Sequence, residues 1–557
     1  MTLASSNSKT KSLQEKLIRL KYQGEEERAK NLANKLGFSY LDLTVSPIRA
    51  EILSLLNEAK AKKAKVAIIQ KREKQLWLGT LDPSNPLAKR IFEEFEKKGY
   101  QIKVFIVSLR GLEKAWAPYK DFVPPSGGIT GKIEIDIEKI KQFQKEIKNL
   151  EIFKQKIIEV PAIDPSKLVE LTIVGALATD SSDIHLEPKE EKVTLRYRID
   201  GVLHDVAFLF PNIYKYILSR IKLLSEMQLN IYDIPQDGRF TIKIGQNDIE
   251  VRVSVVPGAY GENIVMRVLN PQAIKLNLED LGLRKSSLEI IEREIEKPHG
   301  MILTTGPTGS GKTTTLYACL KKLADPTIKI ITLEDPIEYH LGNIAQTQVE
   351  EKRGYTFSKG LRAILRQDPD VVLVGEIRDR DTAETALQAS LTGHLVFSTL
   401  HTNDAAGAVP RFTELGAKAP ILASALTLII AQRLVRKICL KCKVAFSPSA
   451  KQFTQIKKAL EGLPQEIERP ALNQNLKIHK AKGCLQCNQT GYKGRIGVFE
   501  IIIVEDEMEK LISVSPSHAQ ILAFTQKQGS MTMYQDAVLK VLEGITALEE
   551  VERIVGQ

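Results

Sequence analysis

Short apolar runs alternate with longer amphipathic stretches from Gly300 onward. The runs MILTT, IKIITLE, VVLVG and LVFSTL have the length and composition of buried strands, and the stretches between them have helical periodicity. Apolar strands that alternate with helices are typical of a parallel sheet covered on both faces. The pattern predicts an α/β domain over residues 273–557.

Two further folded units are expected upstream. Residues 1–116 alternate helical stretches with the strand-like runs KVAIIQ, LWLGTL and IKVFIVS, which predicts a small α/β domain. Residues 117–164 begin with APYKDFVPPSGGITGK, rich in Pro, Gly and Ser, and continue as a Lys/Glu-rich helical stretch, so we expect a linker. Residues 165–272 contain one helix and several strand-like runs, which favours a mostly antiparallel sheet beside helices.

Composition narrows the class of protein but not its function. Hydrophobic residues make up 43% of the 557 residues and charged residues 26%, a balance typical of soluble multidomain proteins. No apolar run approaches the about 18 residues that span a bilayer, and the first residues lack a secretory signal, so a cytoplasmic location is expected. The net charge of +11 could suit nucleic acid or an anionic membrane, but the lysines are spread through amphipathic helices.

The stretch MILTTGPTGSGKTTT runs from an apolar strand directly into a glycine-rich loop with the spacing of a phosphate-binding loop. Its backbone N–H groups can converge on phosphates, Lys312 can neutralise the β and γ oxygens, and the Thr313 hydroxyl can bind Mg²⁺. The residues expected to bind nucleotide here are Gly306, Pro307, Thr308, Gly309, Ser310, Gly311, Lys312, Thr313 and Thr314.

A second candidate element is LRQDPDVVLVGEIRD, where an apolar strand ends at Gly375 and Glu376. We expect this strand about one strand spacing from the phosphate loop, where Glu376 can order the magnesium shell or a water. Gly375 stands where this kind of motif usually has an aspartate.

The run IITLEDPIEYH places Glu334, Asp335 and Glu338 at the end of another strand. Carboxylates at the carboxyl ends of strands face the ligand site of doubly wound sheets, so Glu338 is the candidate to orient or deprotonate the attacking water. The alternative is that these carboxylates cap a turn around Pro336.

The run TGHLVFSTLHTND places His394 and His401 at opposite ends of a strand, so they are not expected to form a metal pair. His401 can contact the γ-phosphate through a hydrogen bond; a purely structural histidine is the alternative.

Taken together, GPTGSGKTTT, ITLEDPIEY, LRQDPDVVLVGEIRD and TGHLVFSTLHTND resemble the secretion ATPases of type II secretion and type IV pilus assembly. These motifs are the family's Walker A, aspartate box, Walker B and histidine box, in the family's order, and the family's Walker B also has a glycine before its glutamate. The resemblance extends from about Pro165 to the C-terminus. It implies a RecA-like P-loop motor domain that hydrolyses ATP with Mg²⁺, preceded by a PAS-like α+β domain.

Arginines form a further set of candidates. Arg239, Arg252 and Arg267 stand on strand-like runs, where arginine is costly to bury unless it meets an anion. The resemblance implies that Arg252 and Arg267 reach the γ-phosphate as arginine fingers and that Arg239 lies close by. Arg362 and Arg366 are four residues apart on one helix face, and the resemblance places such a pair near nucleotide and subunit interface; a solvated face is the alternative.

Four of the five cysteines form two CxxC pairs, Cys439 with Cys442 and Cys484 with Cys487. Two such pairs can present four thiolates to one structural Zn²⁺; free buried cysteines or a redox pair are the alternatives. The 41 residues between Cys442 and Cys484 exceed an ordinary zinc-ribbon loop, so a folded insertion is expected over about 437–495. Cys319 is expected to lie in the core.

The resemblance also implies a task. Such ATPases form homohexamers that drive fibre assembly through an inner-membrane platform protein, and retraction motors lack both the amino-terminal extension and the cysteine insertion that this chain has. The extension AKNLANKLGFSYLDLTVSPI resembles the domain that docks on a membrane partner, at the inner face of the cytoplasmic membrane. It contains a single KLGFSYLDL, so cyclic di-GMP binding is not expected.

A DNA-transport or DNA-uptake motor and an inactive nucleotide-gated scaffold are the alternative functions. With 6% aromatic residues and no stacking platform, no direct nucleic-acid contact is expected.

Overall fold

The computed structural model describes most of the chain. It covers residues 22, 24–44, 55–72, 75–97, 99–117, 131–135, 138, 165–245, 247–269, 276–463, 467, 469, 471–473 and 475–556. The chain divides into two compact units, Met1–Gly128 and Ile129–Gln557. Most of the expected linker and helical segment at 117–164 lies outside the described residues. In the part of the chain that is described, no helix has the length and apolar character needed to cross a membrane.

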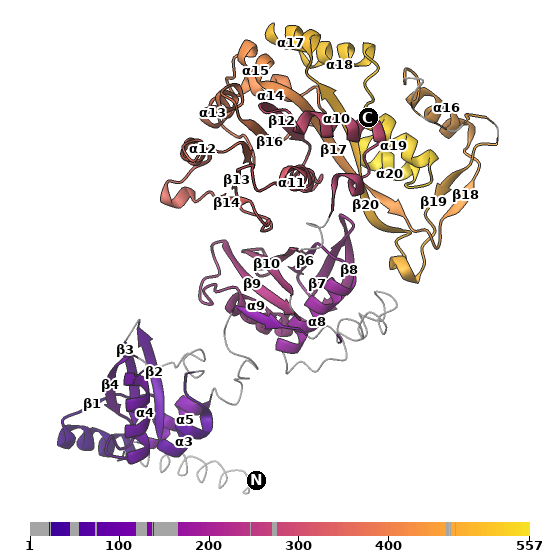
Figure 1. Cartoon of the computed structure of the whole chain (residues 1–557). Helices are drawn as coiled ribbons and strands as arrows, with labels where there is room; N and C mark the ends of the chain where they lie inside the picture. Colours follow the sequence, from indigo (N-terminus) through magenta and orange to yellow (C-terminus); the bar gives the residue numbers. More distant parts are fainter. Residues whose placement is uncertain are drawn as a thin grey trace. The chain divides into compact units, whose positions relative to one another are not determined.

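The first unit is a small α/β domain, as the sequence predicts (Figure 1). Its four-stranded sheet has the order β1-β4-β3-β2, with β2 and β3 antiparallel and the other neighbours parallel. The strands are β1 (Ser39–Tyr40), β2 (Val66–Arg72), β3 (Gln75–Thr80) and β4 (Gln101–Ile106), and the helices α3 (Glu58–Ala64), α4 (Pro86–Lys97) and α5 (Leu109–Trp116). Alternate apolar side chains such as Leu76 and Leu78 are fully buried beneath the helices.

The second unit begins with a seven-stranded sheet in the order β5-β9-β10-β11-β6-β7-β8. All neighbours are antiparallel except β5, which pairs in parallel with β9, so the expected mostly antiparallel sheet is confirmed. The strands are β5 (Lys132–Glu134), β6 (Asp183–Pro188), β7 (Val193–Ile199), β8 (Val202–Leu209), β9 (Gln236–Ile244), β10 (Asn247–Val256) and β11 (Asn263–Leu269). We call it the arginine sheet, for the side chains described below.

Helices α8 (Pro165–Ala178) and α9 (Pro211–Leu224) cover one face of the arginine sheet (Figure 1). The alternation along β10 explains how: Val251, Val253 and Val255 are buried in the core shared with these helices, and the residues between them face the other way. Arg252 therefore lies on the uncovered face of the sheet.

A second seven-stranded sheet forms the core of the C-terminal part of the chain, in the order β14-β13-β15-β16-β12-β17-β20. The first six strands are parallel and β20 is antiparallel to β17, so the parallel sheet expected from the apolar runs is confirmed, with an antiparallel edge strand added. The strands are β12 (Gly300–Thr305), β13 (Ile330–Glu334), β14 (Ala345–Gln348), β15 (Val371–Val374), β16 (Leu395–Leu400), β17 (Leu426–Ile438) and β20 (Tyr492–Ile503).

Helices pack on both faces of this second sheet and enclose two hydrophobic cores. They are α10 (Lys285–Ile295), α11 (Lys312–Leu323), α12 (Phe357–Leu365), α13 (Arg380–Leu391), α14 (Ala408–Glu414), α15 (Ala419–Ala425), α17 (Asp506–Ser513), α18 (His518–Lys527), α19 (Met533–Leu542) and α20 (Leu548–Val555), with short 3-10 helices at η3 (Leu278–Leu281) and η4 (Glu351–Arg353).

The strand order corrects one expectation about the site. Strand β16 lies between β12, which leads into the phosphate loop, and β15, which leads to Glu376. The expected separation of one strand spacing is therefore wrong; the two strands are two spacings apart. The reason is that the strand order of a parallel sheet is set by how its helical crossovers pack, which a single apolar run does not encode.

Between β17 and β20 the chain forms the cysteine-bearing insertion. It contains β18 (Val444–Phe446) paired antiparallel with β19 (Ile478–Lys480), helix α16 (Ala450–Ala459) and the 3-10 turn η5 (Leu485–Cys487). Ser449 caps α16 with its side chain, which fixes the start of that helix. The long spacing between the CxxC pairs is thus filled by folded structure, as expected.

Candidate functional site

The glycine-rich loop joins the end of β12 to the start of α11, as its sequence predicts. Gly306 has φ 145° and Gly311, the residue that caps α11, has φ 94°, which L side chains rarely adopt. A Cβ on Gly306 would lie 2.5 Å from the carbonyl oxygen of Gln432, and one on Gly311 2.8 Å from the Gln432 side chain. The loop therefore needs glycine at both positions, and it directs backbone N–H groups and the helix N-terminus toward one point.

Lys312 lies at the first turn of α11 with most of its side chain buried. Its Nζ donates to the carbonyl oxygens of Gly306 at 2.7 Å and Pro307 at 3.2 Å. Burial lowers the pKa of Lys312 to about 8, an effect that the nearby Glu376 carboxylate partly offsets. The hydroxyl of Ser310 is buried without a hydrogen-bond partner among the described residues, so this loop holds a donor that a phosphate oxygen can use.

A cavity of about 1080 Å³ opens beside this loop and brings most of the predicted site residues together. Of the predicted residues, it is lined by Pro307, Thr308, Gly309, Ser310, Gly311, Lys312, Thr313, Thr314, Glu334, Asp335, Glu338, Glu376, His401, Arg252 and Arg267. Four of the residues predicted for nucleotide binding or hydrolysis lie outside its lining: Gly306, Arg239, Arg362 and Arg366. Its volume is that of a cavity for a ligand the size of a nucleotide.

Glu334 is a buried carboxylate of the cavity that three side chains hold in place. Tyr317 donates its hydroxyl to Oε2, and Oε1 accepts from Thr332 at 2.6 Å and from Gln346 at 3.2 Å. Burial and the neighbouring carboxylate raise the pKa of the Tyr317 phenol, so the tyrosine stays a donor. Glu334 is therefore fixed by its neighbours at the end of β13, whereas Asp335 beside it is one-third exposed.

Glu376 follows β15 and is nearly buried, with 14% of its side chain exposed. It pairs with Arg378, and Nε2 of His401 lies 3.5 Å from its second oxygen. Burial lowers the pKa of His401, and the charge of Lys312 acts in the same direction, so the imidazole is neutral near pH 7. His394 lies at the other end of β16, where Nδ1 contacts the carbonyl oxygen of Ala389 at 3.0 Å, away from the cavity lining.

Glu338 meets an arginine that comes from the other sheet. Arg252 on β10 donates from Nη1 to Oε2 of Glu338 at 3.1 Å and from Nη2 to the carbonyl oxygen of Ile337. Arg252 also lies 3.6 Å from Glu250. The uncovered face of the arginine sheet thus contacts the loop that follows β13, and the contact joins a predicted arginine finger to a predicted catalytic carboxylate.

The strand register arranges these arginines in a row. Across neighbouring strands Arg239 is opposite Arg252, Arg252 opposite Arg267, Arg267 opposite Asp183, and Asp183 opposite Arg198. We call these five residues the arginine row. Asp183 and Arg198 also line the cavity, and the sequence reasoning missed both, because pairing register alone brings them beside Arg267. The sequence feature that could have identified Asp183 and Arg198 is the presence of polar residues at alternate positions of otherwise apolar strands.

Exposure varies strongly along the arginine row. The side chain of Arg252 is 23% exposed, that of Arg267 54% and that of Arg239 75%. Arg239 lies 4.0 Å from Glu250 and lines a smaller cavity of about 310 Å³ instead of the one beside the phosphate loop. Within one chain, therefore, Arg252 and Arg267 are placed toward the phosphate loop and Arg239 is not.

The remaining arginine pair lies on α12. Arg362 is in the last turn of the helix, and Arg366 follows Leu365 as the residue that caps it. Both side chains are exposed. Other arginines that the sequence reasoning missed do line the cavity, namely Arg378, Arg433, Arg495 and Arg553. They come from a loop, from the adjacent strands β17 and β20 and from α20, so their meeting depends on the fold of the C-terminal part.

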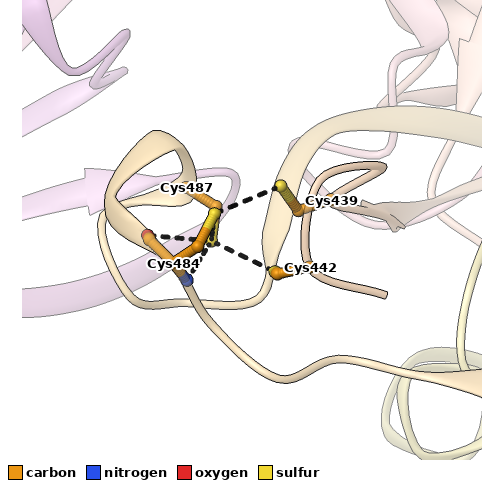
Figure 2. A group of neighbouring side chains, drawn as sticks. All are labelled: Cys439, Cys442, Cys484 and Cys487. Carbon is orange, nitrogen blue, oxygen red and sulfur yellow. Dashed lines mark hydrogen bonds between the residues drawn. The ribbon is translucent and has the colours of Figure 1, made fainter. Parts of the chain in front are cut away.

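The four cysteines of the insertion converge on one point (Figure 2). Sγ of Cys439 lies 3.8 Å from Sγ of Cys484, Sγ of Cys442 lies 3.8 Å from Sγ of Cys487, and the sulfurs of Cys484 and Cys487 are 3.7 Å apart. With Zn–S bonds of about 2.3 Å, a tetrahedral site has sulfurs about 3.8 Å apart. Backbone N–H groups of Cys484 and Gly491 donate to Sγ of Cys487 at 3.2 Å, as they do to thiolates. The cluster is compatible with a zinc site.

Cys319 lies apart from this cluster, on α11 in the core, as expected. Burial raises the pKa of its thiol to about 12. A protonated, fully buried thiol is inert, so Cys319 has a packing role.

Comparisons with known proteins agree with this geometry. Residues 164–553 match the family model described as Type II/IV secretion system protein. The chain is 45% identical over 388 residues to type II secretion system protein E of Pseudomonas aeruginosa, covering 70% of this chain and 75% of the relative. It is 36% identical over 533 residues to the type IV pilus assembly ATPase PilB of Thermus thermophilus, covering 94% of this chain and 57% of PilB.

A solved structure supports the fold. The X-ray structure of the Legionella pneumophila ATPase DotB matches with a TM-score of 0.50 at 20% sequence identity, covering 70% of this chain and 95% of DotB. At this identity the similarity concerns the fold alone.

Proposed function

We propose that this chain, which belongs to the type II/IV secretion system protein family and is therefore an ATPase, uses ATP hydrolysis to drive assembly of a type IV pilus or a type II secretion pseudopilus through an inner-membrane platform protein. The observation that carries the proposal is the contact of Arg252 with Glu338 beside the phosphate loop. The contact supports the proposal because movement of the arginine sheet would then be coupled to hydrolysis, as a mechanical motor requires.

The first part of the mechanism is binding of the phosphates. Lys312 leaves the loop carbonyls of Gly306 and Pro307 for the β and γ oxygens, and the backbone of the loop and the N-terminus of α11 hold the remaining charge. Thr313 and Glu376, which both line the cavity, are the residues we propose to hold Mg²⁺ and its water shell. Bound there, Mg²⁺ would neutralise charge on the phosphates.

The second part is activation of the water. While Arg252 donates to Glu338, that carboxylate oxygen is engaged and is a poor acceptor for a water proton. Arg252 can exchange Glu338 for the γ-phosphate, since both are anionic acceptors. The exchange would free Glu338 to orient the water and would place Arg252 and Arg267 as arginine fingers on the transition state. Neutral His401 can donate one hydrogen bond near the same phosphate.

Assembly is favoured over a retraction motor by two features of this chain. The amino-terminal α/β unit is folded, and the match to the pilus assembly ATPase PilB covers 94% of the chain, so it includes this unit. The cysteine-bearing insertion is the second feature. A DNA-transport or DNA-uptake motor is the second candidate, and stimulation of ATP hydrolysis by DNA would favour it over the assembly function.

The proposed partners are a homohexamer of this chain, the platform protein and a membrane-anchored protein that the amino-terminal unit contacts. Peripheral association with the cytoplasmic membrane is supported by the charge of residues 437–495, which contain 12 Lys and Arg but only three Glu and no Asp. The tips of the two CxxC turns, Leu440 and Leu485, are exposed next to these lysines. Co-sedimentation with membranes that contain the platform protein tests this part of the proposal, and a wholly unbound protein would contradict it.

The hexamer proposal predicts where the activity lies. When the purified protein is separated by size exclusion, ATP hydrolysis per chain is expected to be at least about tenfold higher in the hexamer fractions than in monomer fractions, because a neighbouring subunit stabilises the closed site. Equal activity per chain in both fractions would contradict the shared-site motor. A preparation without hydrolysis in any fraction would contradict the proposed function as a whole.

We propose a structural Zn²⁺ at the four cysteines. Purified protein is expected to contain one zinc per chain, and Cys442→Ser is expected to remove most of it and to lower the Tm by several degrees, because the ion holds both ends of the insertion together. Nucleotide binding should persist, since the phosphate loop lies outside the insertion. Elemental analysis and thermal unfolding measure both effects. Cys319→Ala, which removes a thiol far from the cluster, should retain the zinc; metal-free wild-type protein would contradict the site.

A further inference from the structure

Asp183 is a buried carboxylate in the middle of the arginine row. Only 8% of its side chain is exposed. Oδ1 accepts from Nε of Arg267 at 3.1 Å, Oδ2 lies 3.3 Å from Nε of Arg198, and Ser182 donates its hydroxyl to Oδ2 at 2.8 Å. Three groups thus fix the carboxylate of Asp183 at the wall of the cavity that the phosphate loop also lines.

Both arginines approach Asp183 through Nε and not through a terminal nitrogen. Arg267 uses Nε toward Asp183, so its terminal amino groups are not needed for that bond, and its half-exposed side chain lines the cavity. Arg198 likewise approaches Asp183 with Nε and donates from Nη1 to the carbonyl oxygen of Gly201 at 3.2 Å. A guanidinium held through Nε loses less freedom when it later binds an anion, because its side chain is already ordered.

The charge of Asp183 has a second effect. The arginine row places four guanidinium groups on adjacent strands, and Asp183 is the one acid within the row. A negative charge in a partly desolvated cavity lowers the positive potential there, and the interaction falls only slowly with distance. Such a charge weakens the binding of every phosphate group, including the product phosphate.

From these contacts we propose that Asp183 is a positioning residue for ATP hydrolysis: it holds Arg267 and Arg198 toward the phosphate site and keeps the affinity for product phosphate low. The proposal rests on the proposed role of Arg267 as an arginine finger. It adds Arg198 to the arginines proposed for the site and assigns a positioning task to a buried carboxylate.

The test is Asp183→Asn in the full chain, which keeps the size of the side chain and removes its charge. The turnover number is expected to fall about tenfold, because the asparagine amide is uncharged and offers one acceptor oxygen where Asp183 offers two to Arg267 and Arg198. The concentration of inorganic phosphate that inhibits hydrolysis by half is expected to fall by at least about threefold, because the cavity gains positive potential. A purely structural role would lower turnover without strengthening phosphate inhibition.

Two further variants separate position from charge. Asp183→Glu keeps the charge but displaces the carboxylate by one methylene, so turnover should fall while phosphate inhibition stays at the wild-type level. If the asparagine variant does not fold, the glutamate variant still tests whether the position of the carboxylate sets the turnover number. Asp205→Asn is the matched control: Asp205 pairs with Nε of Arg196 at 2.9 Å in the same sheet, and neither residue lines the cavity. The control should change neither quantity.

A double variant tests whether Asp183 acts through Arg267. In an Arg267→Ala background, Asp183→Asn should lower turnover by clearly less than about tenfold, because only Arg198 is left for Asp183 to hold. A full tenfold loss in that background, or unchanged phosphate inhibition in the single variant, would overturn the inference while leaving the arginine finger in place. Wild-type turnover in Arg267→Ala alone would overturn both the finger and the inference.

Discussion

Lys312→Ala is expected to reduce ATP turnover by at least about a thousandfold, to the background of the assay. Lys312 is the cation at the centre of the phosphate loop, and its removal takes away the charge that is worth most in a buried, partly desolvated site. Glu376→Ala should have an effect of the same order, because Glu376 faces Lys312 across the cavity. Steady-state release of phosphate measures both.

The lysine also predicts a pH dependence. The pKa of Lys312 is lowered from 10.5 to about 8, so the free protein loses the ammonium charge as the pH rises through 8. Affinity for ATP should therefore be full below about pH 7 and fall by up to about tenfold per unit above pH 8. Bound phosphate favours the charged form, so proton uptake should accompany ATP binding near pH 8. An affinity that does not change between pH 7 and 9 would contradict this account of Lys312.

Arg252→Ala is the second variant with a large expected effect. Turnover should fall by about 10³-fold, the magnitude typical of an arginine finger, while affinity for nucleotide changes by only a few-fold. The physical reason is that Arg252 comes from the arginine sheet and acts on charge that develops in the transition state, whereas the phosphate loop provides ground-state binding. Turnover, and binding of a labelled nucleotide, should be measured on the same preparation.

The matched control is Arg196→Ala. Arg196 lies on β7 of the same sheet, is about as exposed as Arg252 and pairs with Asp205 and Glu187, outside the cavity lining. The Arg196→Ala substitution removes the same charge from the chain and should leave the turnover number within about twofold of the wild-type value. Equal turnover in Arg252→Ala and wild type would disprove the finger assignment. An equal loss in both arginine variants would instead show that the sheet, and not this contact, had been damaged.

The sequence predicts those parts of the site that are formed by residues close together along the chain. The strand, the glycine-rich loop and the helix after it follow one another without a gap, so the geometry around Lys312 needed no knowledge of the rest of the chain. The spacing within each CxxC pair is likewise a local feature that can be read directly from the sequence. Their sulfurs meet across the folded insertion at distances that are compatible with four thiolates on one metal ion.

What the sequence left open depends on the order and register of strands. The insertion of β16 between β12 and β15 and the antiparallel strand β20 are properties of the whole sheet. The same holds for Asp183, which is far in sequence from Arg267 and meets it only because β6 pairs with β11 in one register. A shift of one residue would turn Asp183 into the apolar core, so the partnership is specified by burial of its neighbours Ile184 and Leu186.

The arginine row has a thermodynamic consequence. Its members are fixed to five hydrogen-bonded strands, so in the proposed mechanism they would approach or leave the phosphate loop together, and the position of this sheet would be linked to nucleotide affinity. Linkage is reciprocal: a load that pulls this sheet away from the loop weakens ATP binding by the same factor by which bound ATP resists the load. A tenfold change in affinity corresponds to about 1.4 kcal/mol of mechanical work. Force on the sheet and ATP in the cavity therefore act on a single equilibrium.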